Sequence, residues 1–260
     1  MASTLLAPPV QAQLGLSLTP MRLEVPATPG KAFTGTLMLG NSGLEKVRVR
    51  AEILDFYVDA NQTPQFFSTV PAEAEHSCRA WLSLNPMETE LPGRGNLPIR
   101  FTLRIPENAK ERSFHCAIGF VSMPPADEVV GIGVRTAVRV VSVLYPIVGK
   151  PSVAGSIAGL EMESVAAGGA RKWRGVLLLN NDGFMFFRPQ GSVDVLDASG
   201  KIVEHIVVAS FPVLPKRKQR FLLPIKADLP AGQYTLHARV DLGTEVQEAS
   251  VQVTATLPNQ

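Results

Sequence analysis

The residue types that bind metals or transfer protons are few in this sequence and lie far apart. Two acidic residues, Asp55 and Glu88, are typical of turn or surface groups in a β protein. No nucleophile elbow and no phosphate-binding glycine loop is present. The four histidines form no i,i+4 pair and no Cys/His cluster with zinc spacing: His76, His115, His205 and His237. The sequence therefore predicts no enzyme, no metal site and no cofactor.

The two cysteines, Cys78 and Cys116, are the remaining reactive side chains. Cys116 alternates in phase with Phe114, Ile118 and Phe120, so we expect it to face a core. An exported protein permits a disulfide, but the sequence does not show whether the two Cβ atoms approach. The pattern favours two buried thiols over a bridge. It predicts that Cys116 resists thiol reagents until the protein is unfolded.

The elements that would position such side chains are strands, because hydrophobic and polar residues alternate through most of the chain. The alternating runs end in residues typical of turns, as at 29–30, 41–43 and 92–93. Antiparallel strands with one buried face produce this pattern. Clear examples are Leu14 to Leu18, Met21 to Val25, Phe33 to Leu39, Val47 to Ile53 and Ile99 to Ile105.

A short sequence pattern occurs twice in the chain. Residues 35–43 and 175–183 match in their Gly, Leu and Asn positions, and the alternation is interrupted at 147–152. We therefore predict an all-β protein with two immunoglobulin-like antiparallel β-sandwich domains in tandem, comprising 14–147 and 150–256.

The composition supplies enough apolar residues for two packed cores. Hydrophobic residues make up 45% and charged residues 18% of the chain, which excludes a disordered protein. Trp81 and Trp173 are expected at or near the two cores. The net charge of +2 gives no electrostatic case for nucleic acid. A basic run at 216–220 is interpreted as a solvated loop.

Residues 1–13 have the features of a residual signal peptide. They are apolar, they contain no Lys or Arg, and the segment 10–12 is close to a small-x-small cleavage pattern. Elsewhere no stretch approaches the ~18 apolar residues of a membrane span, so no stable membrane insertion is expected.

Three stretches together resemble the first domain of the periplasmic chaperones that assemble pili. They are the opening strand with Arg22, the Trp-Leu strand that ends at Pro86, and the run 134–146 that ends in Tyr-Pro. The resemblance covers about residues 14–147. The second domain is similar to that of divergent exported chaperone-like proteins.

This resemblance implies a role in fimbria biogenesis in the Gram-negative periplasm. A chaperone of this family lends an edge β-strand to an incomplete pilus, fimbrial or other surface subunit, and backbone hydrogen bonds join the two proteins. A basic pair holds the C-terminal carboxylate of the subunit. The implied partners are such subunits and an outer-membrane usher.

The resemblance assigns the client-carboxylate site to Arg22. Its neighbours Met21 and Leu23 are expected to point into the core, so Arg22 should face outward. The second cationic residue of the family is not matched at positions 141 or 142, and Arg139 is its expected substitute.

The donor strand is expected within 130–144, where apolar residues alternate on one face. The same alternation also fits a strand of the protein's own core. An alternative function is a structural or adhesive envelope module that binds a surface-protein partner stably. The donor residues are Val130, Ile132, Val134, Val138 and Val140.

Overall fold

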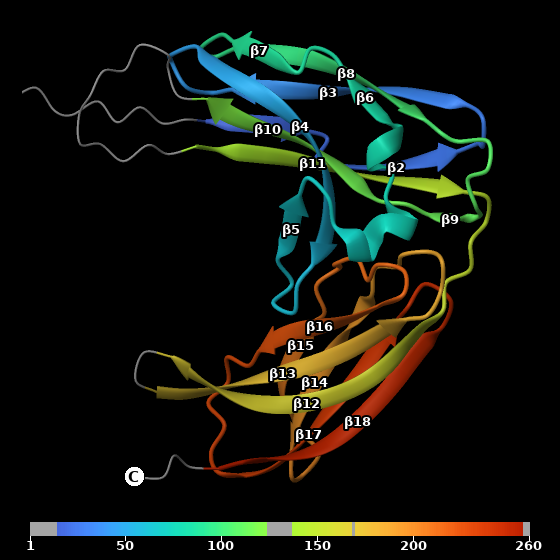
Figure 1. Cartoon of the computed structure of the whole chain (residues 1–260). Coiled ribbons are helices and arrows are strands. Elements are labelled where there is room, and N and C mark those ends of the chain that lie inside the picture. The colour runs from blue at the N-terminus through green and yellow to red at the C-terminus, as the bar shows by residue number, and fades with distance from the viewer. Residues whose placement is uncertain (1–14, 124–136, 168–169, 257–260) are drawn as a thin grey trace, which may run out of the picture.

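The structure of the protein, a computed structural model, describes residues 15–123, 137–167 and 170–256. Figure 1 shows two β-sandwiches, one above the other, joined by a single connection. No sheet within the described ranges contains strands from both halves. The predicted all-β fold with tandem sandwiches is confirmed.

The first sandwich packs a four-stranded sheet on a seven-stranded sheet. The first strands of the chain divide between both sheets, and β2 runs parallel to β11 at the edge of the larger one. The smaller sheet has the order β1 (Leu16–Thr19), β3 (Ala32–Asn41), β8 (Asn96–Arg104), β6 (Leu82–Leu84). The larger has the order β2 (Arg22–Ala27), β11 (Arg139–Val148), β10 (Cys116–Met123), β4 (Val47–Val58), β5 (Pro64–Phe67), with β7 (Glu88–Leu91) and β9 (Arg112–Ser113) beside it. Two short 3-10 helices follow β5: η1 (Pro71–His76) and η2 (Arg79–Trp81).

The second sandwich packs a three-stranded sheet on a four-stranded sheet. Its strand pairs are antiparallel. The three-stranded sheet has the order β12 (Gly155–Ala167), β13 (Ala170–Asn181), β16 (Arg217–Pro224). The four-stranded sheet has the order β15 (Ile202–Val207), β14 (Gln190–Asp197), β17 (Gly232–Asp241), β18 (Val246–Ala255). Trp81 packs against the first core and Trp173 against the second, as predicted.

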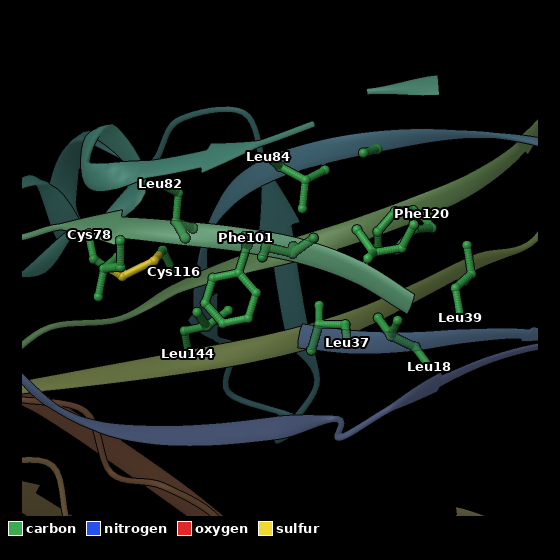
Figure 2. Packing of buried hydrophobic residues seen from close by; sticks show 14 of the residues in the cluster. Leu18, Leu37, Leu39, Cys78, Leu82, Leu84, Phe101, Cys116, Phe120 and Leu144 are labelled. Atoms are coloured by element: carbon green, nitrogen blue, oxygen red, sulfur yellow. A yellow bond between two sulfur atoms is a disulfide. The ribbon is translucent and has the colours of Figure 1, made fainter. Parts of the chain in front are cut away.

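A disulfide joins Cys78 to Cys116 inside the first core, with the two Cα atoms 5.3 Å apart. Figure 2 shows the bond beside Phe101 and Leu144. The prediction that Cys116 faces a core is confirmed, but the preference for two buried thiols was wrong. The approach of the two cysteines depends on how the η2 segment packs against β10, and the alternation pattern does not contain that information.

The repeated sequence pattern has a structural cause in the first sandwich. Asn41 is buried at the end of β3, where its Oδ1 accepts a hydrogen bond from the Gly43 N–H at 2.9 Å. Its Nδ2 donates to the carbonyls of Glu45 at 2.8 Å and Pro92 at 3.1 Å. One amide thus closes the turn after β3 and ties it to a distant loop.

The second copy of the pattern repeats this arrangement. Asn181 at the end of β13 accepts from the Gly183 N–H at 2.9 Å, and it donates to the carbonyls of Met185 at 2.9 Å and Val213 at 3.0 Å. Each asparagine bonds three backbone groups at the end of its strand and so fixes the turn that follows, which explains why the same residue recurs.

The two sandwiches meet at a junction that contains a small apolar core of its own. Its buried members come from both domains: Leu54, Phe56, Ala117, Tyr145, Phe186 and Leu214. The β4–β5 hairpin reaches down to the second sandwich in Figure 1. There the Gln62 Oε1 accepts from the Leu222 N–H at 2.8 Å, and the Gln219 Nε2 donates to the Asp59 carbonyl at 2.9 Å.

The basic run at 216–220 belongs to this junction, so its interpretation as a solvated loop was wrong. Arg217 begins strand β16 and pairs with Glu73 of the first domain, while Gln219 is buried. Arg220 pairs with Glu163. Arg217 and Arg220 are thus held by partners that are distant in the sequence.

We predict that Asn41→Ala or Asn181→Ala lowers the free energy of unfolding by about 1–3 kcal/mol, because each substitution removes a buried amide that makes three hydrogen bonds to the backbone. Urea denaturation measures the change. Asn180→Ala is the matched control, since its half-buried side chain bonds to the exposed Asp182 and to no backbone group in the described structure, and it should change stability by less than about 0.5 kcal/mol. An equal loss in the control variant would contradict this role.

Candidate functional site

Arg22 lies at the start of β2, where the larger sheet of the first domain borders the junction. In the sheet register Arg22 stands beside Val143 of β11, which stands beside Ala117 of β10 and Leu54 of β4. Residues paired in this way share a face of the sheet. Because Leu54 and Ala117 belong to the junction core, Arg22 is on the junction face.

The environment of Arg22 confirms that its side chain is exposed, but one neighbour was wrongly predicted. Leu23 packs against the first core as expected. Met21 is 66% exposed, because β2 begins only at Arg22 and Met21 belongs to the link from β1. Its carbonyl accepts a hydrogen bond from the Val143 N–H at 3.0 Å.

A second arginine, Arg188, reaches the same place from the second domain. Its guanidinium carbon lies 5.0 Å from the ring centroid of Tyr145 and 4.8 Å from that of Phe186. Its Nη1 lies 2.9 Å from the Oε1 of Glu24, two residues after Arg22. Only 13% of the Arg188 side chain is exposed, and its Nε is buried without a hydrogen-bond partner in the described structure.

The electrostatics of this site follow from burial and from two like charges. Burial lowers the pKa of Arg188; Tyr145 and Glu24 oppose that shift, whereas the positive charge of Arg22 adds to it. Burial also raises the pKa of Tyr145 to about 12. A buried cation beside a second, exposed cation makes this place positively charged, which suits an incoming anion.

The structure does not bring Arg139 into this site. Arg139 precedes Val143 by four residues on β11, which places it about 13 Å away along the strand. Its Nε lies 3.1 Å from the Oε2 of Glu52. The cation beside Arg22 is Arg188 instead. The sequence signal for it was the run 184–187, where aromatic residues break the alternation just before an arginine.

The first half of β11 has one side without a strand partner among the described residues. β2 pairs with β11 only from Val143 onward. On the other side of β11, β10 pairs with this strand from Arg139 onward. The Val143 N–H points toward β2, so the backbone groups of Arg139 and Val141, in the same phase, point toward the open side. This open edge leads directly to Arg22.

The predicted donor residues fall partly within the described chain. Val138 is half-buried and exchanges hydrogen bonds with Ser122, whose N–H donates to the Val138 carbonyl and whose Oγ accepts from the Val138 N–H. Val140 packs against the core of its own sandwich. Val130, Ile132 and Val134 lie outside the described residues.

Comparisons with known proteins were made for the whole sequence and fold. No family model and no curated protein matches the sequence. Solved structures are similar over most of their length. A chaperone–tip adhesin complex of CFA/I fimbriae is 10% identical, with a TM-score of 0.49, covering 92% of this chain and 98% of that chain. The chain resembles fimbrial chaperones.

Two further structures extend this similarity. The E. coli chaperone DraB is 18% identical, with a TM-score of 0.44, over 94% of this chain and 97% of that chain. The CsuC–CsuE chaperone–tip adhesion subunit complex of Acinetobacter baumannii is 12% identical, with a TM-score of 0.46, over 91% and 97%. At such identities the likeness concerns the fold alone.

The described parts of the chain hold no group of three or more His, Cys, Asp or Glu arranged to bind a metal ion. Nor do they include a helix with the length and apolar character needed to cross a bilayer.

We predict that the Tyr145 phenol ionises near pH 12, because the folded protein keeps it buried. The raised pKa means that its contribution to stability is complete below pH 10 and is lost as the pH rises to about 12. The measurement is an ultraviolet pH titration of the protein and of Tyr145→Phe, whose difference isolates this phenol. A difference that titrates near pH 10 would contradict the burial.

Proposed function

We propose that the protein is a periplasmic chaperone that caps pilus, fimbrial or other surface subunits by adding the edge of β11 to an incomplete sheet of the client. The observation that carries the proposal is the open edge at Arg139 and Val141, which ends at the two arginines Arg22 and Arg188. Backbone groups on an open edge bind an extended strand of any sequence, and nearby charges select its end.

The position of the arginines fixes the direction of the added strand. If the client ends in a carboxylate at Arg22, its last residue lies just before Val143 on the open edge, because Met21 and Arg22 already occupy the edge at Val143. The body of its strand must then lie along residues 139–142, because β2 occupies the edge beyond that point. A client strand with this register runs parallel to β11, as β2 does.

The chemistry at the end of the strand favours a carboxylate. Arg22 offers an exposed guanidinium, and the buried Arg188 adds a second positive charge beside it. Glu24 already engages Arg188 through Nη1, so the site carries two cations and one resident anion. One further carboxylate would neutralise it, and bidentate contacts to arginine would set the register of the strand.

The donor residues of the sequence prediction remain part of this proposal. Val130, Ile132 and Val134 would insert apolar side chains into the groove of the client, ahead of Val138 and Val140. The disulfide between Cys78 and Cys116 supports an oxidising compartment such as the periplasm. An outer-membrane usher would receive the client there.

The test uses a fluorescent peptide of alternating apolar and polar residues with a free C-terminal carboxylate, and the same peptide as its C-terminal amide. Fluorescence anisotropy should show that amidation weakens binding about tenfold or more, because charge-assisted hydrogen bonds contribute roughly 1.5–3 kcal/mol. Arg22→Ala and Arg188→Ala should each cause a loss of this size. In either variant the affinities of the amide and the free-acid peptide should differ less than in the unmodified protein, since the carboxylate has lost its partner.

Arg139→Ala is the matched control, because Arg139 lies on the same strand face but pairs with Glu52. It should leave the preference for the free carboxylate unchanged. Equal binding of both peptides to the unmodified protein would refute the carboxylate site. No binding of either peptide would refute strand capture and favour a stable envelope module instead.

A further inference from the structure

Two of the four histidines meet inside the domain junction, although they are distant in the sequence. The rings of His76 and His115 are stacked with their centroids 6.3 Å apart, and both residues are buried. The other two, His205 and His237, lie on the second sandwich with partners of their own, Asp194 and Ser250. Histidine is the side chain whose charge ordinarily changes between pH 5 and 8.

A buried carboxylate links this pair to the second domain. Glu73 of η1 is 2% exposed, and its Oε1 lies 2.5 Å from the Nη2 of Arg217 on β16. Its Oε2 lies 3.2 Å from the Nε2 of His115. Arg217 also donates to the Ala72 carbonyl at 2.8 Å. The main ionic contact between η1 and β16 therefore shares its carboxylate with an imidazole.

His76 is built into the first domain as a neutral group. His76 Nδ1 lies 2.9 Å from the Ser113 carbonyl, which only accepts, so Nδ1 carries the proton. Burial lowers the pKa of His76; the bond to Ser113 opposes this, while His115 and Arg112 lower it further and Glu73 raises it. His115 packs edge-on against Phe56 at 5.1 Å.

The other charged groups around the pair already have partners, and the titratable Tyr145 makes a ring contact. Arg112 of β9 pairs with the exposed Glu75 at 3.2 Å. Asp55 of β4 is buried, contrary to the prediction of a surface group, and accepts from Ser77. Arg79 donates to the Ile53 carbonyl. Tyr145 packs on the far side of Phe56.

The carboxylate of this cluster borders a pocket at the junction. Arg217 is 39% exposed, and together with Glu73 it lines a pocket of about 320 Å³ at the junction. The remaining walls include Tyr57, Val70 and Leu214 from both domains.

We propose that the stacked pair His76 and His115 makes the domain junction sensitive to acid, so that the two sandwiches separate at the η1–β16 contact when both imidazoles are protonated. The charge count gives the direction. With neutral imidazoles, Glu73 balances Arg217 and Glu75 balances Arg112. A proton on His115 is partly offset by Glu73. A second proton on His76 has no carboxylate left to pair with.

The sign of the pH effect follows from the lowered pKa of His76. Its neutral form stabilises the closed junction fully above its ordinary pKa of 6.5. That stabilisation is lost as the pH falls from there through the pKa of the folded state. The junction should be closed at pH 7.5 and should open progressively in acid.

The experiment is amide hydrogen exchange of the full chain without any client, corrected for intrinsic rates, from pH 7.5 to 5. The reporters are the N–H groups that cross the junction: Ser113 to the Phe184 carbonyl, and Leu222 to Gln62. Their protection should fall about tenfold per pH unit for each proton taken up. Amides in the central strands β10 and β17 should keep theirs.

Two variants distinguish acid opening of the junction from general acid instability of the protein. His76→Gln keeps a donor for the Ser113 carbonyl but cannot be charged, so its junction amides should stay protected at pH 5. His115→Phe, which fills the same space beside Phe56, serves the same purpose if His76→Gln folds poorly. His205→Gln is the control and should behave as the unmodified protein does. Unchanged protection at acid pH, parallel loss in β10 and β17, or loss that persists in both junction variants would each overturn the proposal.

Discussion

The burial of one end of the first sandwich against the second is the constraint on which the rest of the structure depends. The larger sheet of the first domain presents Leu54, Phe56 and Tyr145 on the face turned away from its own core, and Phe186 and Leu214 pack against them. Burying a large apolar side chain contributes about 1.5–3 kcal/mol, so these few contacts determine how the domains sit. The candidate site exists because of this arrangement, since its two arginines come from different domains.

Charges make the junction specific as well as stable. The pair formed by Glu73 and Arg217 is partly buried, and removing one partner of a buried pair typically costs about 3–5 kcal/mol. A sliding or rotated junction would leave Glu73 buried without its cation. The Gln62 and Gln219 side chains act in the same way, because each bonds to a backbone group of the opposite domain. Apolar contacts hold the domains together, and polar contacts select one relative position of the two domains.

The sequence predicted what depends on local periodicity. Strands, two sandwiches and the repeated asparagine turns followed from alternation and from the match of Asn41 with Asn181. The features that the sequence did not predict depend on contacts between residues that are distant in the chain. The alternation around Cys116 gave its face but not its bond to Cys78. The run 216–220 was interpreted as solvated because its partners Glu73 and Glu163 are remote in the chain. Arg188 lies near Arg22 only because the two domains pack together.

The place of Arg217 near the end of the chain has a consequence for biosynthesis. The ribosome completes the first sandwich, with Glu73 and the aromatic surface around Tyr145, before β16 has been made. During that interval the nascent domain exposes an apolar face and a carboxylate whose cation does not yet exist. The first sandwich therefore lacks the cover for this apolar face until the second domain has been translated.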